Sequence, residues 1–310
     1  MAGNRVALAL GSGGARGYAH IGVIDELRHR GYEIVGIAGS SMGALVGGLQ
    51  AAGRLDEFAD WAKSLTQRAV LRLLDPSISA AGVLRAEKIL DAVRDILGEV
   101  TIEELPIPYT AVSTDLLSGK SVWLQRGPVD AAIRASIAIP GVITPHVFGG
   151  RLLADGGILD PLPMAPIAAV NADLTIAVSL AGSEAGGRYE PTDTEPRATT
   201  EWLSRMWRST TALFDTNRSV TPPDATVGTD ELVDTSREEA VPKLGSFEVM
   251  NRTIDIAQAA LARHTLAAYP PDLLIEVPRT ACRSLEFHRA AEVIDIGHEL
   301  GAQAIKALQS

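Results

Sequence analysis

The sequence has very little cysteine: Cys282 is the only one among 310 residues. A single thiol cannot form an internal disulfide, and it cannot supply the thiolate cluster of a structural zinc site. A lone cysteine more often fills a small buried space than acts as a nucleophile. The composition fits a reducing compartment, and we expect cytoplasmic residence.

Long apolar runs are also missing. The run at residues 6–10, close to the N-terminus, is too short for the core of a signal peptide. No other stretch approaches the roughly 20 apolar residues that a membrane-spanning helix needs. The sequence therefore predicts no membrane-spanning segment.

The chain has fewer basic than acidic residues: 28 Lys and Arg against 38 Asp and Glu, which gives a net charge of −10. This balance argues against nucleic acid as a partner and against electrostatic docking on an anionic membrane. It leaves open a transient apolar contact with a membrane surface, which for a cytoplasmic protein is the inner face. Since 46% of the residues are hydrophobic, we expect a globular chain with a substantial core.

Strands and helices are predicted to alternate along the chain. Short apolar runs predict strands at residues 6–10, 34–38, 109–114, 120–125, 151–154, 174–180 and 273–277. Amphipathic spacing predicts helices at residues 54–75, 84–97, 131–136, 199–214, 247–268 and 286–308. One more helix is predicted between Pro163 and Val170. The first 50 residues read as strand, loop, helix, strand, turn and helix, which indicates an α/β unit with a right-handed crossover.

The chain is organised around the pentapeptide Gly39-Ser40-Ser41-Met42-Gly43, between a predicted strand and a predicted helix. This is the G-x-S-x-G pattern of a nucleophile elbow, in which a sharp turn exposes the serine hydroxyl. A side chain at Gly39 or Gly43 would collide with the neighbouring strand or helix. The helix N-terminus behind the turn offers N–H groups to a developing oxyanion. Ser41 is therefore the candidate nucleophile, although the pentapeptide alone also fits an ordinary glycine-rich turn.

A second glycine-rich loop spans residues 11–17, directly after the first predicted strand. It approximates the G-x-G-x-x-G fingerprint of dinucleotide-binding proteins, but in either register one glycine is replaced, by Arg16 or by Ser12. The acidic residue Glu33 precedes its strand, whereas the fingerprint expects it at the strand end. We favour another use of the loop, because successive N–H groups form a nest for an anion and could supply an oxyanion hole for Ser41.

The segment Asp155-Gly156-Gly157 follows the strand predicted at residues 151–154. Enzymes of the α/β class keep active-site groups at such strand ends, although the same residues also form ordinary turns. An ionised Asp155 could accept the proton of Ser41 directly. An ordinary carboxylate, with a pKa of ~3.9, is a weak base towards an alcohol. Desolvation in an apolar cleft would strengthen it.

Histidine is the usual proton acceptor for a serine nucleophile. Chain order would allow a triad of Ser41, Asp155 and either His264 or His288. In α/β-hydrolases the elbow follows several strands, whereas here it follows the second. None of the six histidines lies in a glycine-marked loop just after a strand. The residues therefore favour a Ser–Asp dyad over a triad.

The chain resembles the patatin-like phospholipases, and in particular their small bacterial members, in three ordered and similarly spaced blocks: Gly13-Gly14-Ala15-Arg16-Gly17, Gly39-Ser40-Ser41-Met42-Gly43 and Asp155-Gly156-Gly157. Further similar stretches are Ser113-Thr114-Asp115-Leu116, Ile133-Arg134-Ala135-Ser136, Ile139-Pro140-Gly141 and Pro161-Leu162-Pro163. The likeness covers about residues 5–180 and resumes near 272–310. The glycine block of the family usually begins with glycine where this chain has Ser12.

The resemblance implies a three-layer α/β/α sandwich with a mainly parallel central sheet. It implies hydrolysis of lipid acyl esters, with Ser41 as nucleophile, Asp155 as base, and neither metal nor cofactor. By the same resemblance, the backbone N–H groups of Gly13, Gly14 and Arg16 are expected to form the oxyanion hole.

The polar, variable region at about residues 182–245 matches nothing in the resemblance, and we interpret it as an insertion into a single domain of residues 1–310. Two rival functions stay open. An acyltransferase would use the same acyl-serine but exclude water from deacylation, whereas a binding module would hold lipid or nucleotide without catalysis.

Overall fold

The computed structural model describes residues 4–73, 87–140, 142–182 and 246–309. Residues 1–185 and 253–310 belong to one compact unit, to which the following description applies. The insertion expected at about residues 182–245 lies outside the described residues except for Gly182, and the single-domain organisation stays a prediction. The helix expected at residues 199–214 also lies outside them. Within the described part of the chain, no helix is long and apolar enough to cross a bilayer.

The centre of the fold is one mixed sheet with the strand order β5-β6-β3-β2-β1-β7-β8, and β4 pairs with β3 beside this path. The strands are β1 (Arg5–Leu10), β2 (Glu33–Ser40), β3 (Tyr109–Asp115), β4 (Lys120–Leu124), β5 (His146–Phe148), β6 (Arg151–Asp155), β7 (Leu174–Gly182) and β8 (Leu273–Pro278). Strands β3, β2, β1, β7 and β8 are mutually parallel, whereas β4, β6 and β5 form antiparallel pairs at one end.

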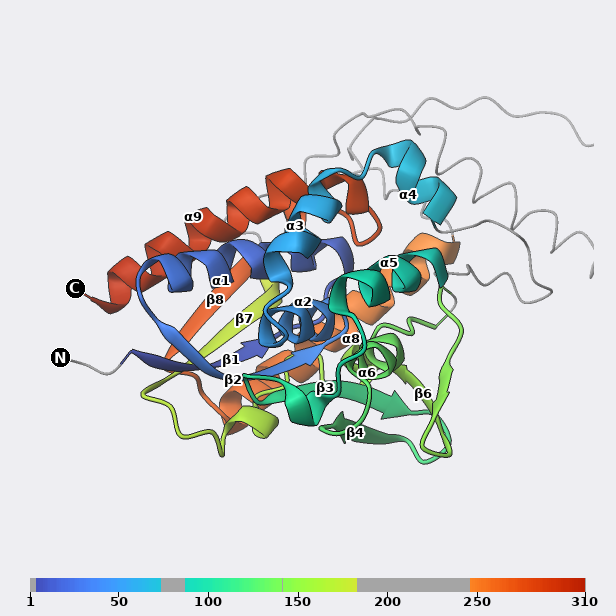
Figure 1. Ribbon diagram of the computed structural model, residues 1–310, viewed down its shortest axis with the longest axis horizontal. Helices are drawn as coiled ribbons and strands as arrows, with labels where there is room; N and C mark the ends of the chain where they lie inside the picture. Colours follow the sequence, from blue (N-terminus) through green and yellow to red (C-terminus); the bar gives the residue numbers. More distant parts are fainter. Residues whose placement is uncertain (1–3, 74–86, 141, 183–245, 310) are drawn as a thin grey trace, which may run out of the picture. The chain divides into compact units, whose positions relative to one another are not determined.

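Helices and short turns connect these strands (Figure 1). The α-helices are α1 (Ala19–His29), α2 (Met42–Ala51), α3 (Leu55–Lys63), α4 (Gln67–Leu73), α5 (Glu87–Leu97), α6 (Val129–Ser136), α8 (Ser246–Ala268) and α9 (Ala290–Leu308). The 3₁₀ turns are η1 (Gly14–Tyr18), η2 (Ile102–Glu104), η3 (Gly156–Ile158), η4 (Ala165–Ile167), η5 (Arg279–Ala281) and η6 (Phe287–Arg289).

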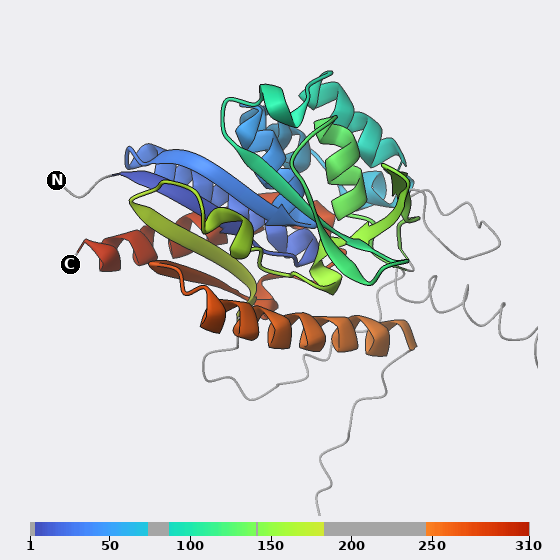
Figure 2. The same cartoon turned by 90° about the horizontal axis from the view of Figure 1, so that it is seen from below.

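The alternation of side-chain size along β1 explains why the two sheet faces differ. Val6, Leu8 and Leu10 point into the large core that α1, α2, α3, α5, α6 and α9 cover. Ala7 and Ala9 point to the other face, where a smaller cluster is made with residues 162–167 and α8. Figure 2 shows α8 beside β8 on that second face. The fold is therefore the predicted α/β/α sandwich, with its main core on the α1 side.

Glycines allow a close contact between α1 and α9 in this core. A β-carbon on Gly22 would lie 2.1 Å from the carbonyl oxygen of Ile294. A β-carbon on Gly297 would lie 2.1 Å from the carbonyl oxygen of Ala19. The two helices therefore pack backbone against backbone.

Three features differ from the sequence predictions. The short edge strand β5 was not predicted, because three residues carry too little of an alternating pattern. The helix expected to end near Val170 is only the turn η4, because the N–H groups of Ile167, Ala168 and Val170 bond the carbonyl three residues back and Pro166, inside the turn, has no N–H. The single helix expected at residues 54–75 is divided into α3 and α4, with residues 64–66 between them.

Candidate active site

The elbow at Ser41 has the strained backbone that its sequence predicts. Ser41 has a φ of 55°, and it is the only non-glycine residue with positive φ in the described ranges. β2 ends immediately before it, and α2 begins immediately after it. A β-carbon on Gly43 would lie 2.0 Å from the carbonyl oxygen of Leu10, so the turn can press against β1 only with glycine there. Such strain at one residue is typical of a functional site.

Strand β3 brings the two halves of the site together. β2 pairs with residues 109–112 of β3, and β6 pairs with residues 113–115. Because β4 occupies the opposite edge of β3, β2 and β6 share one edge. The last residue of β2, Ser40, pairs with Val112, and the last residue of β6, Asp155, pairs with Ser113. The two strands meet end to end, which places Ser41 beside Asp155.

Ser41 and Asp155 form a direct side-chain hydrogen bond. The Ser41 hydroxyl donates to Oδ2 of Asp155 at 2.5 Å, and the N–H of Gly157 donates to Oδ1 at 2.7 Å. Both side chains are buried, with Ser41 2% and Asp155 3% exposed. Burial raises the pKa of Asp155 to about 6, although its two hydrogen bonds act in the opposite direction. A raised pKa makes this carboxylate a stronger proton acceptor than an ordinary one.

The two glycines after Asp155 leave room for their neighbours. A β-carbon on Gly156 would lie 2.1 Å from the Val112 carbonyl oxygen, and one on Gly157 would lie 2.3 Å from the Ser12 hydroxyl. The segment at residues 155–157 therefore fits tightly between β3 and the first glycine loop.

The first glycine loop also contacts the elbow. A β-carbon on Gly17 would lie 2.3 Å from the β-carbon of Met42, which follows Ser41. The three glycine-containing segments that the sequence singled out are thus in mutual contact. The structure brings them to the carboxyl end of β1 and β2, where ligands bind in open α/β sheets.

The N–H groups of the first glycine loop differ in whether they already donate a hydrogen bond. The Ala15 N–H donates to the carbonyl of Ser284 at 2.9 Å, and the Ser12 N–H donates to that of Pro161 at 2.8 Å. Outside η1 itself, the N–H groups of Gly13 and Gly14 have no acceptor within the described part of the chain. Arg16 is the third residue of η1, where a 3₁₀ turn begins to use its own N–H groups. Gly13 and Gly14 are therefore better placed than Arg16 as oxyanion donors.

Ser136 contacts the candidate nucleophile Ser41, although the sequence predicts no role for it. Its hydroxyl accepts a hydrogen bond from the Ser41 N–H at 2.9 Å and donates one to the Val112 carbonyl at 2.6 Å. Ser136 is fully buried at the end of α6. Ser136 ends the family-like stretch Ile133-Arg134-Ala135-Ser136, but a contact across 95 residues has no local sequence signal.

The histidines contribute no hydrogen bond to Ser41 or Asp155 among the described residues. His264 is exposed on α8, and His288 lies in η6. His20 is fully buried, with Nε2 2.9 Å from the carbonyl oxygen of Gly11, and burial lowers its pKa to about 4. The geometry therefore favours the dyad over the triad.

Comparison with known proteins identifies the family to which the chain is similar. Residues 8–168 match the patatin-like phospholipase family. The chain is 70% identical over 335 residues to an uncharacterized NTE family protein of Mycobacterium tuberculosis, covering 98% of this chain and 92% of that protein. It is 33% identical over 170 residues to the neuropathy target esterase of Drosophila grimshawi, covering 53% of this chain and 12% of that one.

Among solved structures, the chain is similar to VipD from Legionella pneumophila, with 16% identity and a TM-score of 0.46 over 99% of this chain and 67% of that one. The 70% identity to the mycobacterial relative extends over almost the whole of both chains. With the family match over residues 8–168, it shows that the chain belongs to the patatin-like phospholipases, a family of lipid acyl hydrolases.

Proposed function

We propose that this protein hydrolyses acyl esters of lipids through a dyad of Ser41 and Asp155. The observation that carries the proposal is the 2.5 Å hydrogen bond between the Ser41 hydroxyl and a carboxylate that burial has made more basic. The substrates in this proposal are phospholipids, lysophospholipids or other acyl esters.

In the first step, the Ser41 oxygen attacks the carbonyl carbon of the ester while its proton passes to Oδ2 of Asp155. The carbonyl π bond opens, and its electron pair moves to the oxygen, which becomes an oxyanion. When the tetrahedral intermediate collapses, the bond to the alcohol breaks, and the leaving alkoxide takes the proton from Asp155. The acyl group is then esterified to Ser41.

The oxyanion needs hydrogen-bond donors that are oriented before the reaction begins. We assign this role to the N–H groups of the first glycine loop, principally those of Gly13 and Gly14, with Arg16 as the third candidate. Removal of one donor from an oxyanion hole typically costs about 3–4 kcal/mol of transition-state stabilisation.

In the second step, water attacks the acyl carbon and gives a proton to Asp155. The second tetrahedral intermediate collapses, the Ser41 oxygen recovers the proton, and a carboxylic acid leaves. An alcohol or thiol in place of water would give acyl transfer, which is the alternative activity. The hydrogen-bonded dyad argues against a binding module without catalysis.

Contact with a membrane surface is a further part of the proposal. Leu117, in the turn between β3 and β4, is 78% exposed, and Val147, on β5, is 69% exposed. Both belong to the antiparallel end of the sheet, which includes β6 and its terminal Asp155. Co-sedimentation with phosphatidylcholine vesicles should decrease for Leu117→Ser compared with the wild-type protein. Equal sedimentation of the two proteins would contradict this contact.

The experiment compares Ser41→Ala and Asp155→Asn with the wild-type protein on p-nitrophenyl esters of increasing acyl length. We expect kcat to fall at least about a thousand-fold in both variants, since each removes half of the reacting pair. The matched controls are Ser64→Ala and Asp56→Asn, which alter exposed side chains on the helical layer. Turnover above background in folded Ser41→Ala would refute the proposal. Turnover that depends on an added alcohol or thiol would favour the acyltransferase.

A further inference from the structure

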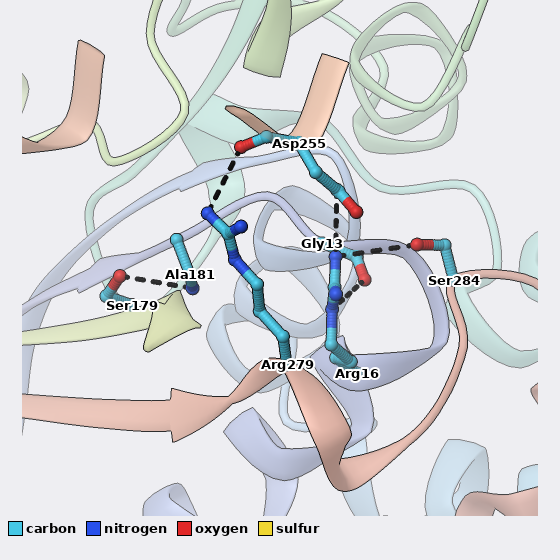
Figure 3. A network of polar contacts seen from close by, with 7 residues as sticks. All are labelled: Gly13, Arg16, Ser179, Ala181, Asp255, Arg279 and Ser284. Atoms are coloured by element: carbon cyan, nitrogen blue, oxygen red, sulfur yellow. Dashed lines mark hydrogen bonds and ion pairs between the residues drawn. The ribbon is translucent and has the colours of Figure 1, made fainter. Parts of the chain in front are cut away.

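Arg16 joins the first glycine loop to a distant helix (Figure 3). Its Nε donates to the carbonyl of Gly13 at 3.2 Å, and its Nη2 donates to Oδ1 of Asp255 at 3.0 Å. A longer bond of 3.4 Å runs from Nη2 to the Ser284 hydroxyl. The Arg16 side chain is only 6% exposed, and that of Asp255 is 27% exposed. The guanidinium is therefore held between the loop and α8, away from bulk water.

The bond to Gly13 has a consequence for the next N–H group. In a trans peptide the C=O and N–H groups are coplanar and point in opposite directions. The described chain has no cis peptide. When Arg16 holds the Gly13 carbonyl on one side of the loop, it turns the Gly14 N–H towards the other side. Gly14 has a φ of 58°, a left-handed conformation that glycine adopts without strain.

We propose that Asp255 is a positioning residue for the oxyanion hole and acts through Arg16. The inference rests on the proposed function, because it assumes that the Gly14 N–H binds the oxyanion. Arg16 has many rotamers, and a flexible arginine would hold the Gly13 carbonyl only part of the time. The carboxylate of Asp255 fixes the guanidinium, and the guanidinium fixes the peptide between Gly13 and Gly14. Asp255 itself touches neither Ser41 nor Asp155 through any hydrogen bond of the described residues.

A second contact of α8 provides the matched control. Nη2 of Arg279 donates to the backbone carbonyl of Asp255 at 3.3 Å and does not involve the Asp255 carboxylate (Figure 3). Arg279→Gln weakens the attachment of α8 but leaves the Arg16–Asp255 pair in place. Asp255→Ala removes that pair. A role in docking α8 and a role in positioning the loop therefore predict different results for the two variants.

The kinetic test uses the full chain and a p-nitrophenyl ester. We expect kcat of Asp255→Ala to fall about 10- to 100-fold with KM within about twofold of the wild-type value, because an oriented donor acts mainly in the transition state. The fall in kcat should be smaller for Asp255→Asn, since its amide oxygen still accepts a hydrogen bond from Arg16. Arg16→Lys should lower kcat as much as Asp255→Ala does, because an ammonium lacks the fork geometry that lets a guanidinium bond the Gly13 carbonyl and the Asp255 carboxylate together. The double variant Arg16→Lys/Asp255→Ala should be no worse than either single variant.

A second measurement does not depend on activity. Hydrogen–deuterium exchange of the peptide that covers residues 12–18 should accelerate in Asp255→Ala and Arg16→Lys but not in Arg279→Gln. If Asp255→Ala does not fold, Asp255→Asn and Arg16→Lys carry both measurements.

The outcomes separate the two proposals. Wild-type protein without esterase activity, but with the expected exchange pattern, would refute the hydrolase and retain the positioning of the loop by Asp255. An active enzyme in which Asp255→Ala keeps wild-type kcat, or in which Arg279→Gln loses as much, would refute the positioning role alone. A rise in KM at unchanged kcat would also overturn it.

Discussion

The Ser136 hydroxyl accepts a hydrogen bond from the backbone N–H of Ser41 at 2.9 Å. The same hydroxyl donates to the carbonyl of Val112 on β3 at 2.6 Å. The strained residue of the elbow is thus attached through one buried side chain to the strand that also pairs with Asp155. This contact holds the backbone of Ser41, whereas the hydrogen bond to Asp155 holds its side chain.

Replacing Ser136 should therefore affect both stability and activity. Ser136→Ala leaves the buried Ser41 N–H without its acceptor, which typically costs about 1–3 kcal/mol. We expect the free energy of unfolding in urea to fall by that amount, and kcat to fall at least about tenfold. Ser64→Ala is the control, because its hydroxyl bonds a backbone carbonyl at an exposed site. Wild-type stability and kcat in Ser136→Ala would show that the contact is dispensable.

The activity should depend on pH through Asp155. Its carboxyl has a pKa of about 6 and must be ionised to accept the Ser41 proton. We expect kcat/KM, which reports the free enzyme, to rise with pH around a midpoint near 6 and to be about a tenth of its maximum one pH unit below that midpoint. The pH dependence of kcat/KM for hydrolysis of a p-nitrophenyl ester measures this midpoint. A profile that is flat from pH 5 to about 8 would mean that Asp155 is not the base.

The same shift predicts how stability depends on pH. Because the folded-state pKa of Asp155 is raised from 3.8 to about 6, protonation of this group favours folding, and the gain is lost as pH rises through about 6. Asp155→Asn removes the buried charge, so it should be more stable than wild type at pH 8, by at most about 3 kcal/mol. The difference should shrink towards pH 4. Thermal unfolding of both proteins between about pH 4 and 8 measures this difference in stability. A difference that does not change with pH would contradict the raised pKa of Asp155.

Gly39 should not tolerate a side chain. A β-carbon there would lie 2.2 Å from the carbonyl oxygen of Gly43, and backbone cannot move aside as a side chain can. Gly39→Ala should reduce the free energy of unfolding by at least about 1–3 kcal/mol. In Gly301→Ala on α9 the nearest atoms lie 3.4 Å away, so this control should be neutral or stabilising. Equal unfolding midpoints for the two variants would refute the steric explanation.

The sequence predicted the parts of the fold that depend on local patterns. The apolar run in β1 and the G-x-S-x-G pattern around Ser41 can be recognised from adjacent residues alone, and both matched the structure. The end of β6 at Asp155 was recognised for the same reason. Local pattern failed at residues 161–170, where only the turn η4 forms and the amide of Ser12 bonds the carbonyl of Pro161.

Contacts between distant residues could not be predicted in this way. Asp255 lies 239 residues from Arg16, on a helix whose apolar face gives no indication of an ion pair. Ser136 is an ordinary helix residue until β3 and the elbow are placed beside it. The pairing of Ser41 with Asp155 was expected from the family resemblance and not from local pattern, because it depends on β2 and β6 sharing one edge of β3.

The most direct measurement is mass spectrometry of the protein after treatment with a fluorophosphonate probe. We predict a single adduct on the peptide that contains Ser41 in the wild-type protein, and none in Ser41→Ala. The rate of labelling should fall strongly in Asp155→Asn. Labelling of another residue, or equal labelling of folded Ser41→Ala, would contradict the assignment of Ser41 as the nucleophile.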